Sequence, residues 1–169
     1  LSAPQLGAAA ARAAIDASGI SADRIDETIM GCVLMAGIGQ APARQAALAA
    51  GVPRQVPATT VNKMCGSALK ALMLASDQIR AQSANVVLAG GIESMSNAPY
   101  LLPKARSGLR MGHAELIDHM FFDGLQSPFD GKLMGHFADA TAKQYEFTRE
   151  QQDQFAAESH HKAVAAQEA

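Results

Sequence analysis

The most informative segment of the chain is Val61-Asn62-Lys63-Met64-Cys65-Gly66-Ser67-Ala68-Leu69-Lys70, which joins a short strand-like run to a long helical pattern. Residues 58–61, Ala-Thr-Thr-Val, are typical of a short strand. From Cys65 onward, apolar residues recur at spacings of three and four, which predicts a helix over residues 65–81. Few charged residues interrupt this helix, so we expect it to be buried on most sides. The apolar positions are Cys65, Ala68, Leu69, Leu72, Met73, Ala75 and Ile79.

Similar strands and helices alternate on both sides of this segment, as far as about Met95. We expect helices at residues 6–18 and 42–50, and strands at residues 28–34 and 86–88. An alternation of helices with short buried strands indicates a layered α/β fold.

Residues 96–135 have a different texture, rich in Gly, Pro, Met and Phe and without a sustained period. A long irregular stretch inside a compact domain is uncommon and is often functional. Helical patterns return after it, and Thr148 with Gln151 fits the capping box of the last helix. We therefore divide the chain into a core domain, residues 1–95, and a loop-rich domain, residues 96–169.

The composition is that of a globular protein, with 49% hydrophobic and 18% charged residues. A net charge of -2 provides no field that would attract nucleic acid or an acidic membrane surface. No apolar run approaches the roughly 20 residues of a membrane-spanning helix. The two cysteines, Cys32 and Cys65, are too few for a disulfide scaffold, so a reducing, cytoplasmic setting is the default expectation.

Cys65 is the candidate nucleophile because of its predicted place at the amino end of a helix. A helix N-terminus carries partial positive charge and free backbone N–H groups, which favour a thiolate over a thiol. The same N–H groups are suited to bind the oxyanion of a thioester adduct. The pattern alone favours a small cysteine buried in a core helix, since free cysteine is among the most buried residue types, and it does not decide between the two alternatives. For Cys32, in mid-strand between Gly31 and Val33, we expect a structural role.

Residues 61–70 resemble the nucleophile segment of the thiolase family, which includes acetoacetyl-CoA and 3-ketoacyl-CoA thiolases. Three further stretches resemble the family in the same order along the chain: residues 37–45, residues 89–96, and Met134-Gly135 followed by residues 148–163. The resemblance thus covers nearly the whole chain. It implies a thiolase-like layered α/β/α core, in which a mixed sheet packs against a buried helix layer, followed by part of a loop domain.

The resemblance also implies an activity, the making or cleaving of 3-ketoacyl-CoA by ping-pong acyl transfer. Cys65 would carry the acyl group as a thioester, and its backbone N–H would help to form an oxyanion hole. Leu125, Leu133 and Met134 would line the channel for coenzyme A and the acyl chain. Coenzyme A, acetyl-CoA and acyl-CoA would be substrates, and neither a metal nor a redox cofactor is implied.

Two positions depart from the family pattern. Many relatives carry glycine at the position of Ala68, so its methyl group is expected to narrow the space near the nucleophile. Leu133 stands where some relatives have a histidine, which makes this contact apolar.

The resemblance further implies parts that this chain does not contain. The family takes a second cysteine, a histidine and an asparagine from its carboxy-terminal half, and its first strand lies ahead of Leu1. We therefore expect both ends to be cut and this fragment alone to be inactive. Lone histidines are weak indicators of a site, so surface or packing roles are expected for all five. They are His113, His119, His136, His160 and His161.

Self-association as a dimer or tetramer is another implication of the resemblance. The basic residues Lys104, Arg106 and Arg110 cluster in the loop-rich domain, which fits an oligomer contact, a field that attracts coenzyme A, or a solvated surface. Two other classes compete with the thiolase hypothesis. One is a condensing enzyme of the ketoacyl-carrier-protein synthase type, against which residues 62–67 and the loop-region similarities argue. The other is a catalytically incomplete or coenzyme A-binding protein that keeps the fold.

Overall fold

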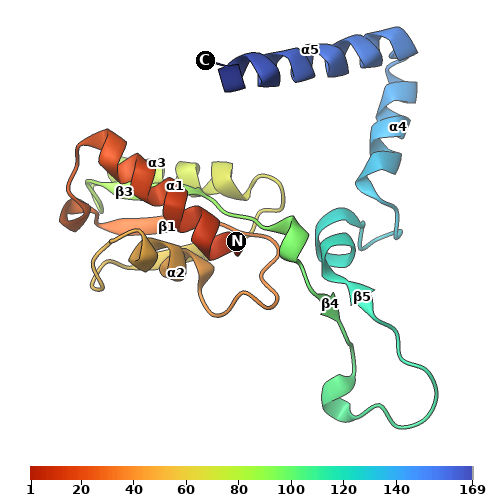
Figure 1. The fold of residues 1–169 in the computed structure, drawn as a ribbon, viewed down its shortest axis with the longest axis horizontal. Coiled ribbons are helices and arrows are strands. Elements are labelled where there is room, and N and C mark those ends of the chain that lie inside the picture. The colour runs from red at the N-terminus through yellow and green to blue at the C-terminus, as the bar shows by residue number, and fades with distance from the viewer. Residues whose placement is uncertain (169) are drawn as a thin grey trace. The chain divides into compact units, whose positions relative to one another are not determined.

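A parallel sheet of three strands organises the first part of the chain (Figure 1). The computed structural model describes residues 1–168. Its strands are β1 (Glu27–Gly31), β2 (Ala58–Val61) and β3 (Val87–Gly91), and they lie in the order β2-β1-β3. Parallel strands need helical crossovers, so the sheet is covered on both faces. The predicted layered α/β arrangement is therefore present.

Helices α1 (Ala3–Ser18) and α2 (Pro42–Ala49) pack against each other on one face of the sheet. Small side chains line this contact, which lets the two helix backbones approach closely. Gln5 accepts a hydrogen bond from the Ser2 N–H at the start of α1, and Gly19 ends the helix in the left-handed conformation. The buried alanines of the two helices are Ala3, Ala8, Ala11, Ala43, Ala46 and Ala47.

Helix α3 (Ser67–Arg80) covers the opposite face, where its first turn lies directly on two glycines. Gly31 of β1 and Gly91 of β3 are neighbours in the strand register. A Cβ atom added to Gly31 would lie only 2.6 Å from the backbone nitrogen of Ala68, and one added to Gly91 only 2.7 Å from the Ala68 Cβ. The close approach of α3 to the sheet therefore requires glycine in both strands.

Two expectations about α3 are wrong in this chain. The helix begins at Ser67 rather than Cys65, and it is buried along one stripe only. That stripe consists of Ser67, Ala71 and Ala75, whose spacing of four places them on one side of the helix. The larger apolar residues point away from the sheet, and they are Leu69, Leu72, Met73 and Ile79.

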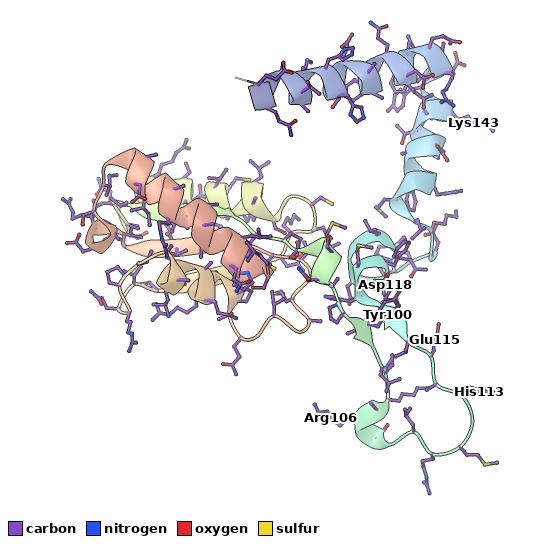
Figure 2. The ribbon with its side chains drawn as sticks, in the orientation of Figure 1. Tyr100, Arg106, His113, Glu115, Asp118 and Lys143 are labelled. Carbon is purple, nitrogen blue, oxygen red and sulfur yellow. The ribbon has the colours of Figure 1, made fainter. Side chains whose placement is uncertain are left out.

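Irregular structure follows β3, as the sequence predicts for residues 96–135. It includes an antiparallel pair of very short strands, β4 (Tyr100–Leu101) and β5 (Ile117–Asp118), and a π-helix, η4 (Met120–Leu125). The side chains of the segment between the two strands extend into solvent (Figure 2). The basic residues Lys104, Arg106 and Arg110 are all exposed in this segment.

The chain forms two compact units, Leu1–Gly124 and Leu125–Ala169, which we describe separately. The second unit contains α4 (Met134–Gln144) and α5 (Arg149–Glu168). Thr148 and Gln151 form the predicted capping box, with N–H to side-chain oxygen distances of 2.9 and 3.2 Å. The domain boundary between residues 95 and 96 stays a prediction. Every helix in residues 1–168 is too short or too polar to cross a membrane.

We predict that Gly31→Ala destabilises the protein, by about 1–3 kcal/mol, because the new methyl group meets the backbone of α3. Gly135→Ala is the matched control, since this glycine lies in α4 with open space around the added Cβ. The control is expected to be neutral or slightly stabilising. Thermal unfolding of the full-length protein carrying each change measures the difference, and equal melting temperatures would show that α3 does not depend on the glycine.

Candidate active site

Cys65 lies in the turn between β2 and α3 and is exposed. Gly66 is the N-cap residue of α3, so Cys65 precedes the helix by two positions. The preceding residue, Met64, has a φ angle of 50°, in the left-handed region that residues with side chains seldom adopt. The structure therefore excludes the alternative in which Cys65 is buried in a core helix. Cys65 lies beside the N-terminus of α3, as predicted.

Free backbone donors surround this turn. Within residues 1–168, the N–H groups of Cys65, Ala68 and Leu69 donate to no protein acceptor. Such unpaired N–H groups at the start of a helix carry its partial positive charge and attract anions. The Cys65 turn thus combines an accessible thiol with donors that suit a developing oxyanion.

Ala68 packs against the sheet, and the expected narrowing of the space beside the thiol stays a prediction. Its methyl group is directed toward the sheet, where the missing side chain of Gly91 leaves room for it. The extra methyl at this position therefore fills the contact between α3 and β3.

Cys32 is structural, as predicted, and is buried where Cys65 is exposed. It has no exposed surface, and its Sγ atom lies 3.6 Å from Oε1 of Glu93. Burial, followed by the negative charge and hydrogen bond of Glu93, raises the pKa of Cys32 to about 12. The thiol is therefore protonated throughout the physiological range.

Glu93 anchors the loop that follows β1, a role that the sequence did not reveal. Its two carboxylate oxygens accept the N–H groups of Val33 and Leu34, each at 2.9 Å. The anchoring residue is about sixty positions away in sequence. Only the resemblance drew attention to it, as part of residues 89–96.

His119 anchors the same loop a little further on. It is 5% exposed, its Nε2 accepts the N–H of Ala36 at 3.3 Å, and its Nδ1 lies 2.5 Å from the Asp123 carboxylate. This pattern requires the neutral ring with its proton on Nδ1, because Nε2 acts as an acceptor. His119 thus has the expected packing role, and His113, His136, His160 and His161 lie at the surface.

Leu125, Leu133 and Met134, the predicted substrate-binding residues, belong to the second unit. Leu125 ends η4, Leu133 precedes α4, and Met134 is its first residue. A loop closed by the pairing of Gln126 with Leu133 brings these positions near one another. Leu133 and Met134 are 42% and 45% exposed, so both are available for contact, and their role in binding stays a prediction.

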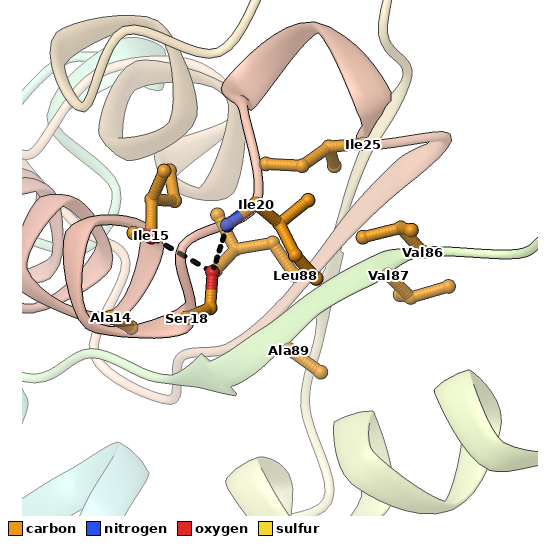
Figure 3. A pocket seen from close by; sticks show the side chains of 9 residues that line it. All are labelled: Ala14, Ile15, Ser18, Ile20, Ile25, Val86, Val87, Leu88 and Ala89. Carbon is orange, nitrogen blue, oxygen red and sulfur yellow. Dashed lines mark hydrogen bonds between the residues drawn. The ribbon is translucent and has the colours of Figure 1, made fainter.

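Cys65 lines neither of two prominent hollows in residues 1–168. One, of about 260 Å³, lies between α1 and β3 and is lined mainly by apolar side chains (Figure 3). Its polar side chain, Ser18, donates to the Ile15 carbonyl and accepts the Ile20 N–H, so its hydroxyl is already engaged. The other, of about 570 Å³, lies in the second unit against Phe147 and Phe155. In the described residues, no three acidic, histidine or cysteine side chains are grouped to hold a metal ion.

Comparison with known proteins defines the class to which this fold and turn belong. Residues 1–169 match the family described as the N-terminal domain of thiolase. The chain is a member of the thiolase family, and the predicted fold class is confirmed.

Particular relatives are similar over almost all of this chain. An acetyl-CoA acetyltransferase of Pseudomonas aeruginosa is 55% identical over 97% of the chain, and one of Cupriavidus necator is 53% identical over 99%. The crystal structure of the Acat5 thiolase from Ascaris suum in complex with coenzyme A superposes with a TM-score of 0.93, at 40% identity over 99% of the chain. The chain spans 42% of the length of the two curated relatives and 44% of the solved one.

We predict that iodoacetamide at pH 8 modifies Cys65 and leaves Cys32 untouched in the folded full-length protein. With a pKa of about 12, only roughly one Cys32 in ten thousand is a thiolate at this pH, and its sulfur is also shielded from solvent. Peptide mass mapping after timed alkylation measures both sites. Modification of both cysteines after denaturation is the control, whereas equal rates in the folded state would contradict the burial of Cys32.

Proposed function

We propose that the protein containing this chain is an acyl-CoA:acetyl-CoA acyltransferase, with Cys65 as the nucleophile that carries the acyl group. The observation that carries the proposal is the setting of Cys65, an exposed thiol directly before the amino end of α3 with unpaired backbone donors beside it. Membership of the thiolase family and similarity to acetyl-CoA acetyltransferases support it.

The proposed reaction has two halves that share one intermediate. In the first, the Cys65 sulfur attacks the thioester carbonyl carbon of acetyl-CoA, a new carbon–sulfur bond forms, and coenzyme A leaves as its thiolate. The free N–H groups near the turn stabilise the negative charge on the carbonyl oxygen during this exchange. In the second half the acyl group passes from Cys65 to an acceptor. Transfer to coenzyme A regenerates a thioester, and transfer to the α-carbon of acetyl-CoA, after a base removes its proton, forms a 3-ketoacyl-CoA.

Leu125, Leu133 and Met134 belong to the same proposal as contacts for coenzyme A or the acyl chain. Their partly exposed apolar side chains suit the methylene and pantetheine parts of such a ligand. The relative from Ascaris suum was crystallised with coenzyme A, which supports this class of ligand. A cytoplasmic location and assembly as a homo-oligomer complete the proposal.

We predict that the full-length protein gains one acetyl group when mixed with acetyl-CoA, and that Cys65→Ser gains none. A thioester is labile to thiols, so added coenzyme A or hydroxylamine is expected to remove the adduct. Intact-mass spectrometry measures the gain, and Cys32→Ser is the matched control, since its buried thiol takes no part in the exchange.

The outcome separates the competing classes. Absence of an adduct on a folded protein whose Cys65 resists alkylation would favour a coenzyme A-binding protein with the thiolase fold. An adduct that forms from acyl carrier protein thioesters in preference to acetyl-CoA would favour a condensing enzyme of the ketoacyl synthase type.

A further inference from the structure

The two peptide groups immediately before Cys65 are held by side chains. Asn62 accepts the Met64 N–H through its Oδ1 atom at 2.9 Å. Ser67 accepts the Lys63 N–H through its hydroxyl oxygen at 2.8 Å, and the same hydroxyl donates to the Met64 carbonyl at 2.5 Å. Three polar groups of the Lys63–Met64 backbone are therefore fixed by two side chains.

Ser67 is well placed to act as a rigid clamp. It is 5% exposed, and its Cβ atom packs against the position where Gly31 has no side chain. As the first residue of α3 it moves with the helix, so its hydroxyl ties the turn to the sheet through the glycine contact. Asn62 holds the exposed side of the same turn through the short Asx arrangement that asparagine favours.

The clamped conformation is one that the backbone would not adopt by itself. The left-handed conformation is unfavourable for methionine, and such a residue persists only where surrounding interactions determine it. The hydrogen bonds to the Met64 N–H and carbonyl from the two side chains are among those interactions. The Ser67 N–H donates to the same carbonyl at 2.9 Å, and the Gly66 N–H donates to the Lys63 carbonyl at 3.2 Å. Because Cys65 follows directly, the Met64 conformation sets the backbone orientation from which the Cys65 side chain projects.

We propose that Asn62 and Ser67 are positioning residues for the nucleophile, acting through the Met64 peptide groups to aim the Cys65 sulfur beside the free donors of α3. This inference rests on the proposed function of Cys65. It assigns a role in catalysis to two side chains that need not touch the substrate.

The test compares Asn62→Ala, Ser67→Ala and Ser67→Thr with Ser76→Ala in the full-length protein. Ser76 is the matched control, because it lies exposed on the same helix and its hydroxyl takes part in none of the side-chain hydrogen bonds found within residues 1–168. The measurement is the rate of Cys65 acetylation over a range of acetyl-CoA concentrations, together with the melting temperature. Ser67→Ala is expected to lower the saturating rate about tenfold, with the half-saturating concentration changed less than about twofold, since misaimed reacting groups slow the chemical step.

Ser67→Thr and Asn62→Ala test which side-chain groups position Cys65. Ser67→Thr keeps the hydroxyl and is expected to retain most of the rate, whereas Asn62→Ala is expected to lower it by about threefold. A lower melting temperature for Ser67→Ala with an unchanged saturating rate would overturn the proposal, because the hydroxyl would then only stabilise the fold. If Ser67→Ala does not fold, Asn62→Ala decides, since its side chain is exposed and its removal leaves the core intact.

The controls separate this inference from the function on which it rests. A wild-type protein that takes up no acetyl group would overturn the proposed function and the positioning roles together. A wild-type protein that is acetylated at the same rate as Ser67→Ala and Asn62→Ala would overturn the positioning roles alone.

Discussion

The first turn of α3 lies directly on β1 and β3, and the geometry around Cys65 depends on this contact. Gly31 and Gly91 stand side by side in the strand register, and neither position has room for a Cβ atom. Ser67 and Ala68 occupy the space that those side chains would take. Since the helix cannot move closer to the sheet or slide along it without a clash, the turn that precedes it is fixed in place as well.

The two cysteines illustrate how position decides chemistry in one small domain. Cys32 follows a central strand, where burial and the adjacent Glu93 carboxylate disfavour the thiolate. Cys65 follows β2 and precedes α3, where it is exposed and free backbone donors are available within residues 1–168. The same functional group is thus a packing element in one case and an accessible thiol in the other.

Helices and strands could be predicted from the sequence because they depend on residues that are close together along the chain. The strand at residues 58–61 and the helix ends at Gly19 and Thr148 follow from local periodicity and capping. The start of α3 could not be predicted to the residue, because the apolar pattern includes Cys65 while the chain still turns there. Periodicity identifies a helix and does not show which side meets the sheet, so the burial of α3 within residues 1–168 is smaller than the pattern predicts.

The supports of the loop after β1 could not be predicted, since they come from distant parts of the chain. Glu93 reaches Val33 across 60 positions and His119 reaches Ala36 across 83. A single carboxylate or histidine carries no pattern that would identify its partner, so the sequence gives only the residue type. The resemblance to thiolases identified Cys65 through its neighbours, and the structure adds the exposure and backbone conformation that those neighbours produce.

The hydrogen bonds that shape the turn before Cys65 join residues close together in the sequence. The hydrogen bonds from Glu93 and His119 to the loop after β1 join residues far apart. Asn62, Ser67 and the backbone between them satisfy one another within five positions, and the platform beneath them comes from β1 and β3. The hydrogen bonds of this turn and the glycine platform beneath it all lie within residues 1–168. A locally closed turn on a rigid platform holds a strained residue at little entropic cost, because few bonds must form across long loops. Local hydrogen bonds and the glycine platform thus explain how the backbone beside an exposed thiol can be held in one conformation.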